Sequence, residues 1–83
     1  MATNRKLYEI AEEINAIWSG RGNGVNFAAE PYLAAMFHLK SIDDTYGADD
    51  ARYIVRYFLN NARSFTGPDA QRIKAELRSM LDK

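Results

Sequence analysis

The residues best suited to recognition chemistry lie in the run ARYIVRYFLNNARSF, at positions 51–65. On the helical period of about 3.6 residues, three arginines line up opposite an apolar face, with Asn60 beside them. Tyr53 and Tyr57 run along the flank between the two. Tyrosine and arginine dominate interface hot spots, because a rigid ring or a forked cation contributes much contact area. The predicted partner-binding residues are Arg52, Tyr53, Arg56, Tyr57, Asn60 and Arg63.

The same arginines and tyrosines suit a phosphate-binding surface, because arginine pairs with phosphate and aromatic rings stack on bases. The second and third predicted helices could also imitate a helix-turn-helix. The connection between them, SIDDTYGADD at positions 41–50, carries four aspartates that would repel phosphate. Protein binding is therefore the leading hypothesis. A nucleic-acid-binding protein using the Arg52, Arg56 and Arg63 stripe is the alternative, and a homo-oligomeric assembly factor is a further one.

The sequence gives little support for catalysis. It contains no cysteine, and its one histidine, His38, has no serine partner on its helical face. The acids fall at turns or on the outer face of the first helix, in neither the EF-hand register nor a Glu-x-x-His motif. We therefore expect no enzymatic activity, no cofactor and no metal, and we expect His38 to be a partly buried structural residue.

Composition favours one small globular domain spanning residues 1–83. Hydrophobic residues make up 47% of the chain, which is enough for one modest core. Formal net charge is zero, yet acids predominate in residues 1–50 and bases in residues 51–83. We expect these halves to pack together and neutralise each other locally. No signal peptide or membrane-spanning run is recognisable, so a cytoplasmic protein is expected.

Apolar periodicity and capping signals predict helices near residues 4–18, 31–41, 49–65 and 67–81, with no strand. Short loops between four helices indicate an all-α, compact, four-helix bundle-like domain. The predicted deeply buried residues are Trp18, Leu33, Phe37, Ile54, Phe58 and Leu77.

The connections carry turn and cap signals. Gly47 is the predicted turn residue, and Asp49 or Asp50 is expected to cap the third helix. Thr66 is expected to cap the fourth helix, with Asp69 completing a capping box. The loop from Gly20 to Gly24, GRGNG, is predicted to be a linker, because its spacing fits neither the P-loop nor the dinucleotide-binding fingerprint. A phosphate-binding loop is the alternative, because glycines let backbone amides approach an anion.

Several runs also carry a resemblance to known proteins. They are Asn26-Phe27-Ala28-Ala29, Pro31-Tyr32-Leu33, Met36, Ser41-Ile42-Asp43-Asp44, Tyr46-Gly47, Ile54-Val55, Tyr57-Phe58-Leu59, Asn61-Ala62, Gly67, Ala70, Ile73-Lys74 and Glu76-Leu77. Through them the chain resembles small helical proteins encoded by phages and prophages of Gram-positive bacteria, over most of residues 7–81. The resemblance implies a small non-enzymatic protein that binds and modulates or inhibits a host protein in the host cytoplasm. Anti-defence and anti-CRISPR proteins belong to that class.

Overall fold

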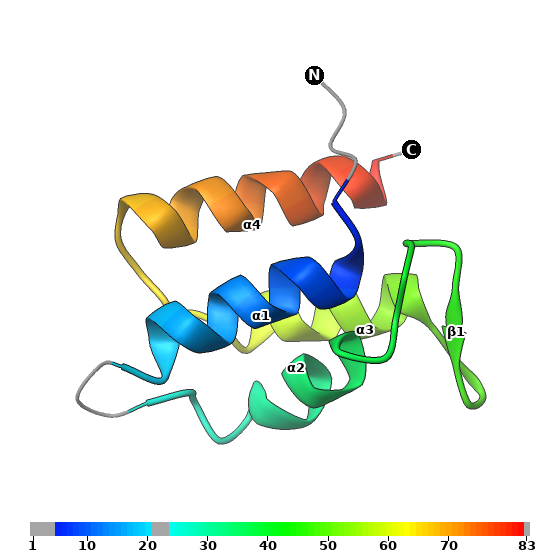
Figure 1. The fold of residues 1–83 in the computed structure, drawn as a ribbon, viewed down its shortest axis with the longest axis horizontal. Helices are drawn as coiled ribbons and strands as arrows, with labels where there is room; N and C mark the ends of the chain where they lie inside the picture. The colour runs from blue at the N-terminus through cyan, green and yellow to red at the C-terminus, as the bar shows by residue number, and fades with distance from the viewer. Residues whose placement is uncertain (1–4, 21–23, 83) are drawn as a thin grey trace.

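The computed structural model describes residues 5–20 and 24–82, and within them the chain forms four helices and one small hairpin (Figure 1). The elements are α1 (Leu7–Trp18), α2 (Glu30–Met36), β1 (Thr45–Tyr46), β2 (Asp49–Asp50), α3 (Ala51–Asn60) and α4 (Pro68–Leu81). The prediction of an all-α fold without strands is wrong, because β1 and β2 pair as an antiparallel sheet. Residue 4 of the first predicted helix and residues 21–23 of the glycine-rich loop lie outside the described residues.

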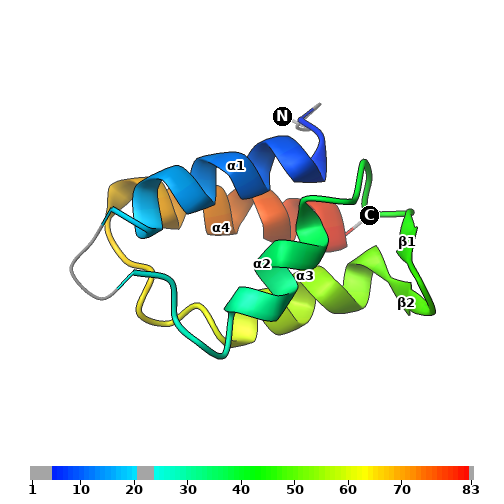
Figure 2. The same ribbon diagram turned by 60° about the horizontal axis from the view of Figure 1, so that its bottom comes forward.

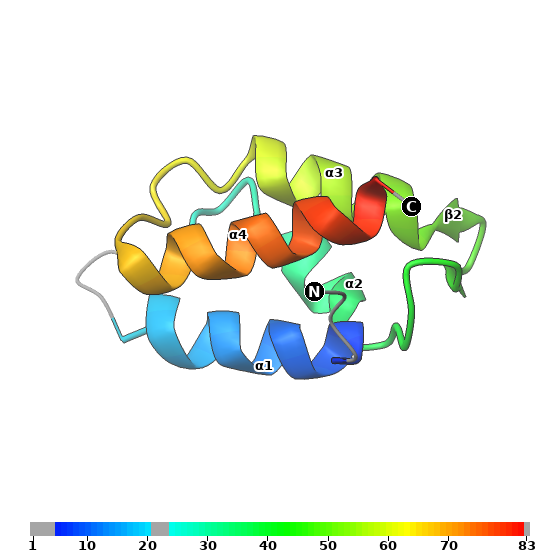
Figure 3. The same ribbon diagram turned by 90° about the horizontal axis from the view of Figure 1, so that it is seen from above.

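Three helices lie along the length of the molecule, and α2 crosses beneath them (Figures 1 and 2). Seen from above, α1 and α4 run side by side in opposite directions, and α3 flanks α4 on its other side (Figure 3). The short α2 packs against both α1 and α3. The hairpin projects from the end of the molecule at which α3 begins (Figure 2).

The hairpin is built on a two-residue turn. Thr45 pairs with Asp50 and Tyr46 with Asp49, which leaves Gly47 and Ala48 as the turn. Gly47 has a φ of 62°, and no described non-glycine residue has a positive φ. A positive φ at the first central position alone is the signature of a type II′ turn, whose twist matches antiparallel strands. Gly47 is thus confirmed as a turn residue, although the strands it joins were not expected.

The hairpin leads directly into α3, and the start of this helix lacks the expected side-chain cap. Asp50 occupies the N-cap position, but its carboxylate makes no capping hydrogen bond with the described residues. The first amide of the helix, that of Ala51, donates instead to the carbonyl oxygen of Asp44 at 2.9 Å. A backbone carbonyl from the loop before β1 therefore satisfies one of the first helix amides, which have no partner within the helix.

The predicted second helix extends too far, because α2 ends at Met36. The amides of His38 and Leu39 donate to carbonyls three residues back, so the chain tightens into successive turns. The carbonyls of Leu39 and Lys40 then accept hydrogen bonds from Tyr8 and Leu7, the first amides of α1. The segment that follows α2 thus supplies backbone acceptors for the first amides of α1.

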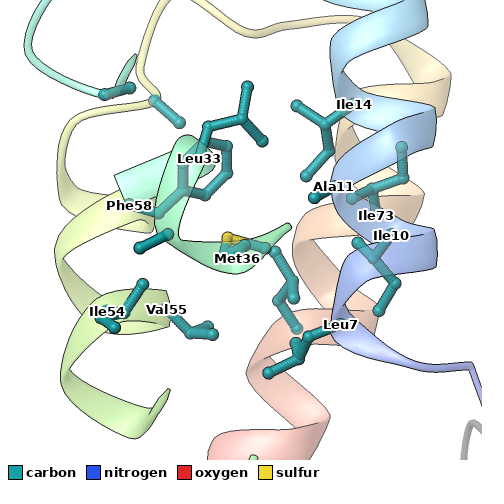
Figure 4. Packing of buried hydrophobic residues seen from close by; sticks show 14 of the residues in the cluster. Leu7, Ile10, Ala11, Ile14, Leu33, Met36, Ile54, Val55, Phe58 and Ile73 are labelled. Atoms are coloured by element: carbon teal, nitrogen blue, oxygen red, sulfur yellow. The ribbon is translucent and has the colours of Figure 1, made fainter. Parts of the chain in front are cut away.

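The core lies between α1, α3 and α4 and is closed by α2. In Figure 4, Met36 lies between the α3 residues Val55 and Phe58 on one side and the α1 side chains on the other. Trp18 is buried against two phenylalanine rings, stacked on Phe65 at 4.9 Å and edge-on to Phe58 at 6.2 Å. Five of the six predicted core residues are buried, namely Trp18, Leu33, Ile54, Phe58 and Leu77.

Phe37 is the exception, since 38% of its surface is exposed. Its predicted burial relied on a helix that would continue to residue 41. Phe37 follows the last residue of α2, where the chain changes from α-helical to tighter turns, so the helical period no longer applies to it.

The fourth helix begins at Pro68, one residue after the predicted start. Gly67, rather than Thr66, is its N-cap, and its φ of 104° lies in a region open mainly to glycine. The expected capping box is therefore wrong. Asp69 instead faces Arg72, with 3.5 Å between carboxylate and guanidinium.

Ion pairs join α4 to α1 and to Arg5, which precedes α1 in the chain. Glu13 accepts hydrogen bonds from Arg72 at 2.6 Å and from Arg5 at 2.7 Å, and Arg5 also pairs with Glu76 at 2.6 Å. The bond from Arg72 is the main cause that holds the pKa of Glu13 below its ordinary value, and the bond from Arg5 adds to it. The acid-rich and base-rich halves of the sequence thus meet along this seam.

Candidate functional site

The predicted partner-binding residues are divided by the structure into separate groups. Tyr53 and Tyr57 are about half exposed, at 52% and 47%, and both lie on α3. Arg56 and Asn60 are exposed on the same helix. Two predicted residues do not belong to this group. Arg52 is bound to other parts of the protein, and Arg63 lies beyond the end of α3.

Arg52 is engaged in contacts within the protein. Its guanidinium pairs with Asp43 at 2.9 Å and approaches the carbonyl oxygen of Leu81, near the end of α4, at 3.5 Å. A cation at a helix C-terminus is favourable because the last carbonyls carry partial negative charge. Arg52 therefore links the loop before the hairpin to α3 and α4, which leaves less of it for a partner.

Arg63 does not share the helical stripe, because α3 ends at Asn60 rather than at residue 65. The Asn61 side chain donates to the carbonyl of Tyr57 at 2.8 Å, and the Asn61 amide bonds the carbonyls of Tyr57 and Phe58. This local competition for helix carbonyls ends the helix. Arg63 remains exposed, but in the turn that follows α3.

Tyrosine rings from two helices form a continuous ladder. Tyr32 of α2 lies against Tyr57, with ring centroids 5.5 Å apart and planes inclined by 31°. Tyr57 in turn lies against Tyr53, one helical turn away, at 6.3 Å and 19°. The rings of Tyr53 and Tyr57 are therefore nearly parallel, that of Tyr32 is tilted, and the three follow one another across the α2–α3 boundary.

This ladder lines an open cleft of about 550 Å³, which we call the tyrosine cleft. Its lining residues are Pro31, Tyr32, Ala35, Tyr46, Asp49, Tyr53, Ile54 and Tyr57. Helix α2 supplies one wall, α3 the other, and the hairpin supplies Tyr46 and Asp49. Ile54, one of the lining residues, is only 4% exposed and belongs to the core cluster, so core packing holds this part of the cleft in place.

Of these eight residues, Tyr53 and Tyr57 were predicted from the sequence to bind a partner. Tyr46 and Asp49 lie in the predicted connection at positions 41–50, where Asp49 was expected at most to cap the third helix. The missed signal is the Tyr-Gly-Ala-Asp run, since a glycine at the first position of a two-residue turn is a hairpin signature. That hairpin brings Tyr46 and Asp49 together.

A second, smaller hollow of about 440 Å³ lies on α2 and its flanks. Its lining includes Val25, Leu33, Phe37 and His38. His38 is exposed rather than partly buried as expected, and its ring stacks on Tyr46 at 5.4 Å. This ring pair connects the segment after α2 to the hairpin.

Metal and membrane features were sought in the part of the chain that the structure describes. No group of three histidine or acidic residues between positions 5–20 and 24–82 is placed to hold a metal ion. None of the described helices is both long and apolar enough to cross a bilayer.

The chain matches no protein-family model, and comparison with curated proteins and with solved structures finds no match. The resemblance to small phage proteins therefore remains a prediction.

Proposed function

We propose that this chain is a non-enzymatic protein-binding domain whose partner docks on the tyrosine cleft. The observation that carries the proposal is the convergence of four tyrosines, Tyr32, Tyr46, Tyr53 and Tyr57, on one open cleft. Tyrosine combines a large apolar ring with a polar tip and only two torsions to freeze, so it is enriched at interfaces. Exposed Arg56 and Asn60 extend this surface along α3.

The kind of partner follows from the sequence resemblance. A host protein that is bound and modulated or inhibited, in the host cytoplasm, is the partner that a phage origin would favour. The tyrosine cleft supports protein binding in general, and the host partner is the more specific part of the proposal.

The test is affinity capture from a host lysate, with nuclease present, followed by identification of the retained protein. Wild type is compared with the Tyr53→Ala/Tyr57→Ala double variant and with Gln71→Ala, a change on the exposed face of α4. We expect a partner retained by wild type and Gln71→Ala and lost by the double variant. Circular dichroism establishes that all three proteins are folded. A partner retained equally by all three would place the interface elsewhere and overturn the proposal.

Nucleic-acid binding is the second candidate, and one observation favours it. Arg56 and Arg63 are exposed and make no ion pair within the described residues, and the near-parallel rings of Tyr53 and Tyr57 could stack on bases. Electrostatic binding of this kind weakens steeply with added salt. Micromolar binding to single-stranded or duplex DNA near physiological salt, lost in an Arg56→Ala/Arg63→Ala variant, would favour this candidate.

Self-association remains the third candidate, because Phe27 is 89% exposed and Phe37 is 38% exposed. Large exposed apolar side chains can mark an interface between copies of a chain. Sedimentation over a range of concentrations measures it directly. A dimer in wild type that becomes a monomer in Phe27→Ser would support assembly as the function.

A further inference from the structure

We propose that the tyrosine cleft binds an extended, proline-containing peptide segment that carries a basic residue. This inference rests on the proposed function and specifies the chemistry of the partner. Proline-rich segments adopt the polyproline II helix and dock on aromatic-lined grooves, because their conformation is already restricted before binding.

Ring geometry is the first argument. Neighbouring rings in the ladder are separated by 5.5 Å and 6.3 Å, with planes inclined by 31° and 19°. A polyproline II chain rises about 3.1 Å per residue. Each ring-to-ring interval therefore corresponds to about two peptide residues, so successive X-Pro units can lie against successive rings.

The tyrosine hydroxyls provide the second argument. The hydroxyls of Tyr32, Tyr46, Tyr53 and Tyr57 make no hydrogen bond with any other described residue. A polyproline II segment has no internal hydrogen bonds, so its carbonyl oxygens need donors from the binding surface. A row of tyrosine hydroxyls supplies donors at the ring edges. An amphipathic helix has satisfied its own carbonyls and would not use them.

Charge is the third argument. Among the described residues that line the cleft, Asp49 alone carries a charge, and it is exposed at the hairpin end. Its carboxylate forms no ion pair within residues 5–20 and 24–82, whereas Asp43 is already paired with Arg52. A lysine or arginine of the peptide can bind Asp49, which gives the peptide a direction along the cleft. The same carboxylate disfavours a phosphate backbone at this position.

The experiment is selection from a display library of random peptides, with wild-type protein as bait and the Tyr53→Ala/Tyr57→Ala variant used to remove other binders. We expect the selected peptides to be enriched in X-Pro repeats and in one flanking lysine or arginine. A synthetic peptide from this set is then measured by fluorescence anisotropy. Tyr57→Ala should weaken its binding by about tenfold or more, the loss expected for an interface hot spot.

Two further variants test the roles of the hydroxyl and the carboxylate. Tyr57→Phe keeps the ring and should weaken binding less than Tyr57→Ala does. Asp49→Asn should weaken binding of the basic peptide severalfold and leave a peptide with glutamine in place of the basic residue unaffected. Gln71→Ala should bind as wild type does.

Selected peptides without proline, with acidic residues, or with helical apolar spacing would overturn this inference, and so would the absence of any binder. The proposed function is judged separately by the lysate capture. A protein partner lost in the double variant but contacting the cleft through a non-proline segment would leave the proposed function standing and this inference refuted.

Discussion

Replacing Phe58 with alanine should remove much of the stability of this protein. The Phe58 side chain is fully buried and lies edge-on to Trp18 at 6.2 Å, with planes 79° apart. Removing a buried phenylalanine ring costs about 3–5 kcal/mol, and about 0.5–1.5 kcal/mol of that reflects the aromatic pair. A chain of 83 residues is expected to have a free energy of unfolding of about 4–12 kcal/mol. Phe58→Ala should therefore lose at least about a quarter of this free energy of unfolding, and at the lower end of the range it should not fold.

Thermal and denaturant unfolding followed by far-UV circular dichroism measure this loss. About 4–8 °C of Tm per kcal/mol, as for domains of this size, predicts a fall of at least about 12 °C. Phe58→Leu, which keeps most of the volume, should cost less than about 1.5 kcal/mol. Fluorescence of Trp18, the only tryptophan, provides an independent signal in the wild type.

Tyr57→Ala is the matched control, because Tyr57 directly precedes Phe58 on α3 and is 47% exposed. Its free energy of unfolding should change much less than that of Phe58→Ala. If Phe58→Ala melted within a degree or two of wild type, or if Tyr57→Ala lost more stability, the assignment of the buried face of α3 would be refuted.

Three further predictions follow from local contacts. The pKa of Glu13 is lowered mainly by the hydrogen bond from Arg72, so the Glu13 carboxylate stabilises the fold above about pH 4.5, and this stabilisation is lost as pH falls through the lower pKa of the folded state. Glu13→Gln should flatten this part of the curve of unfolding free energy against pH. An unchanged curve would contradict the ion pair between Glu13 and Arg72. Gly47→Ala should lower the free energy of unfolding by about 1–2 kcal/mol, measured by denaturant unfolding, because the φ of residue 47 is 62°. An added Cβ meets no described atom within 4 Å, so the loss comes from backbone strain. An unchanged free energy of unfolding would mean that residue 47 does not have a positive φ. A double-mutant cycle on Arg52 and Asp43 should give a coupling below about 1 kcal/mol that declines with salt, because both side chains are solvent-accessible, and a larger, salt-independent coupling would refute this.

Local pattern was enough to predict four helices and most of the core. The positions of Trp18, Ile54, Phe58 and Leu77 follow from apolar side chains that recur every three or four residues. That period is a property of the helix itself, so burial can be read without knowledge of the neighbouring helices.

Helix ends and caps were predicted less well, because distant backbone groups decide them. The predicted second helix runs to residue 41, but α2 ends at Met36, and the carbonyls of Leu39 and Lys40 accept hydrogen bonds from the first amides of α1. Phe37 lies just past this earlier end, so the helical period that predicted its burial does not apply to it. The first amide of α3 donates to the distant carbonyl of Asp44, and the Asp50 side chain makes no capping bond with the described residues. Sequence spacing carries no direct record of these partners.

For the candidate site, sequence determined one side of the cleft and tertiary structure determined the rest. Tyr53 and Tyr57 share a face because they are four residues apart on one helix. Tyr32 joins their ladder only because α2 packs across α3, and Asp49 reaches the cleft only because Gly47 turns the chain back as a hairpin. Arg52, chemically suited to bind a partner, instead pairs with Asp43. Residue type and helical period set which side chains can recognise a partner, whereas long-range packing decides which of them meet and which are already bound within the fold.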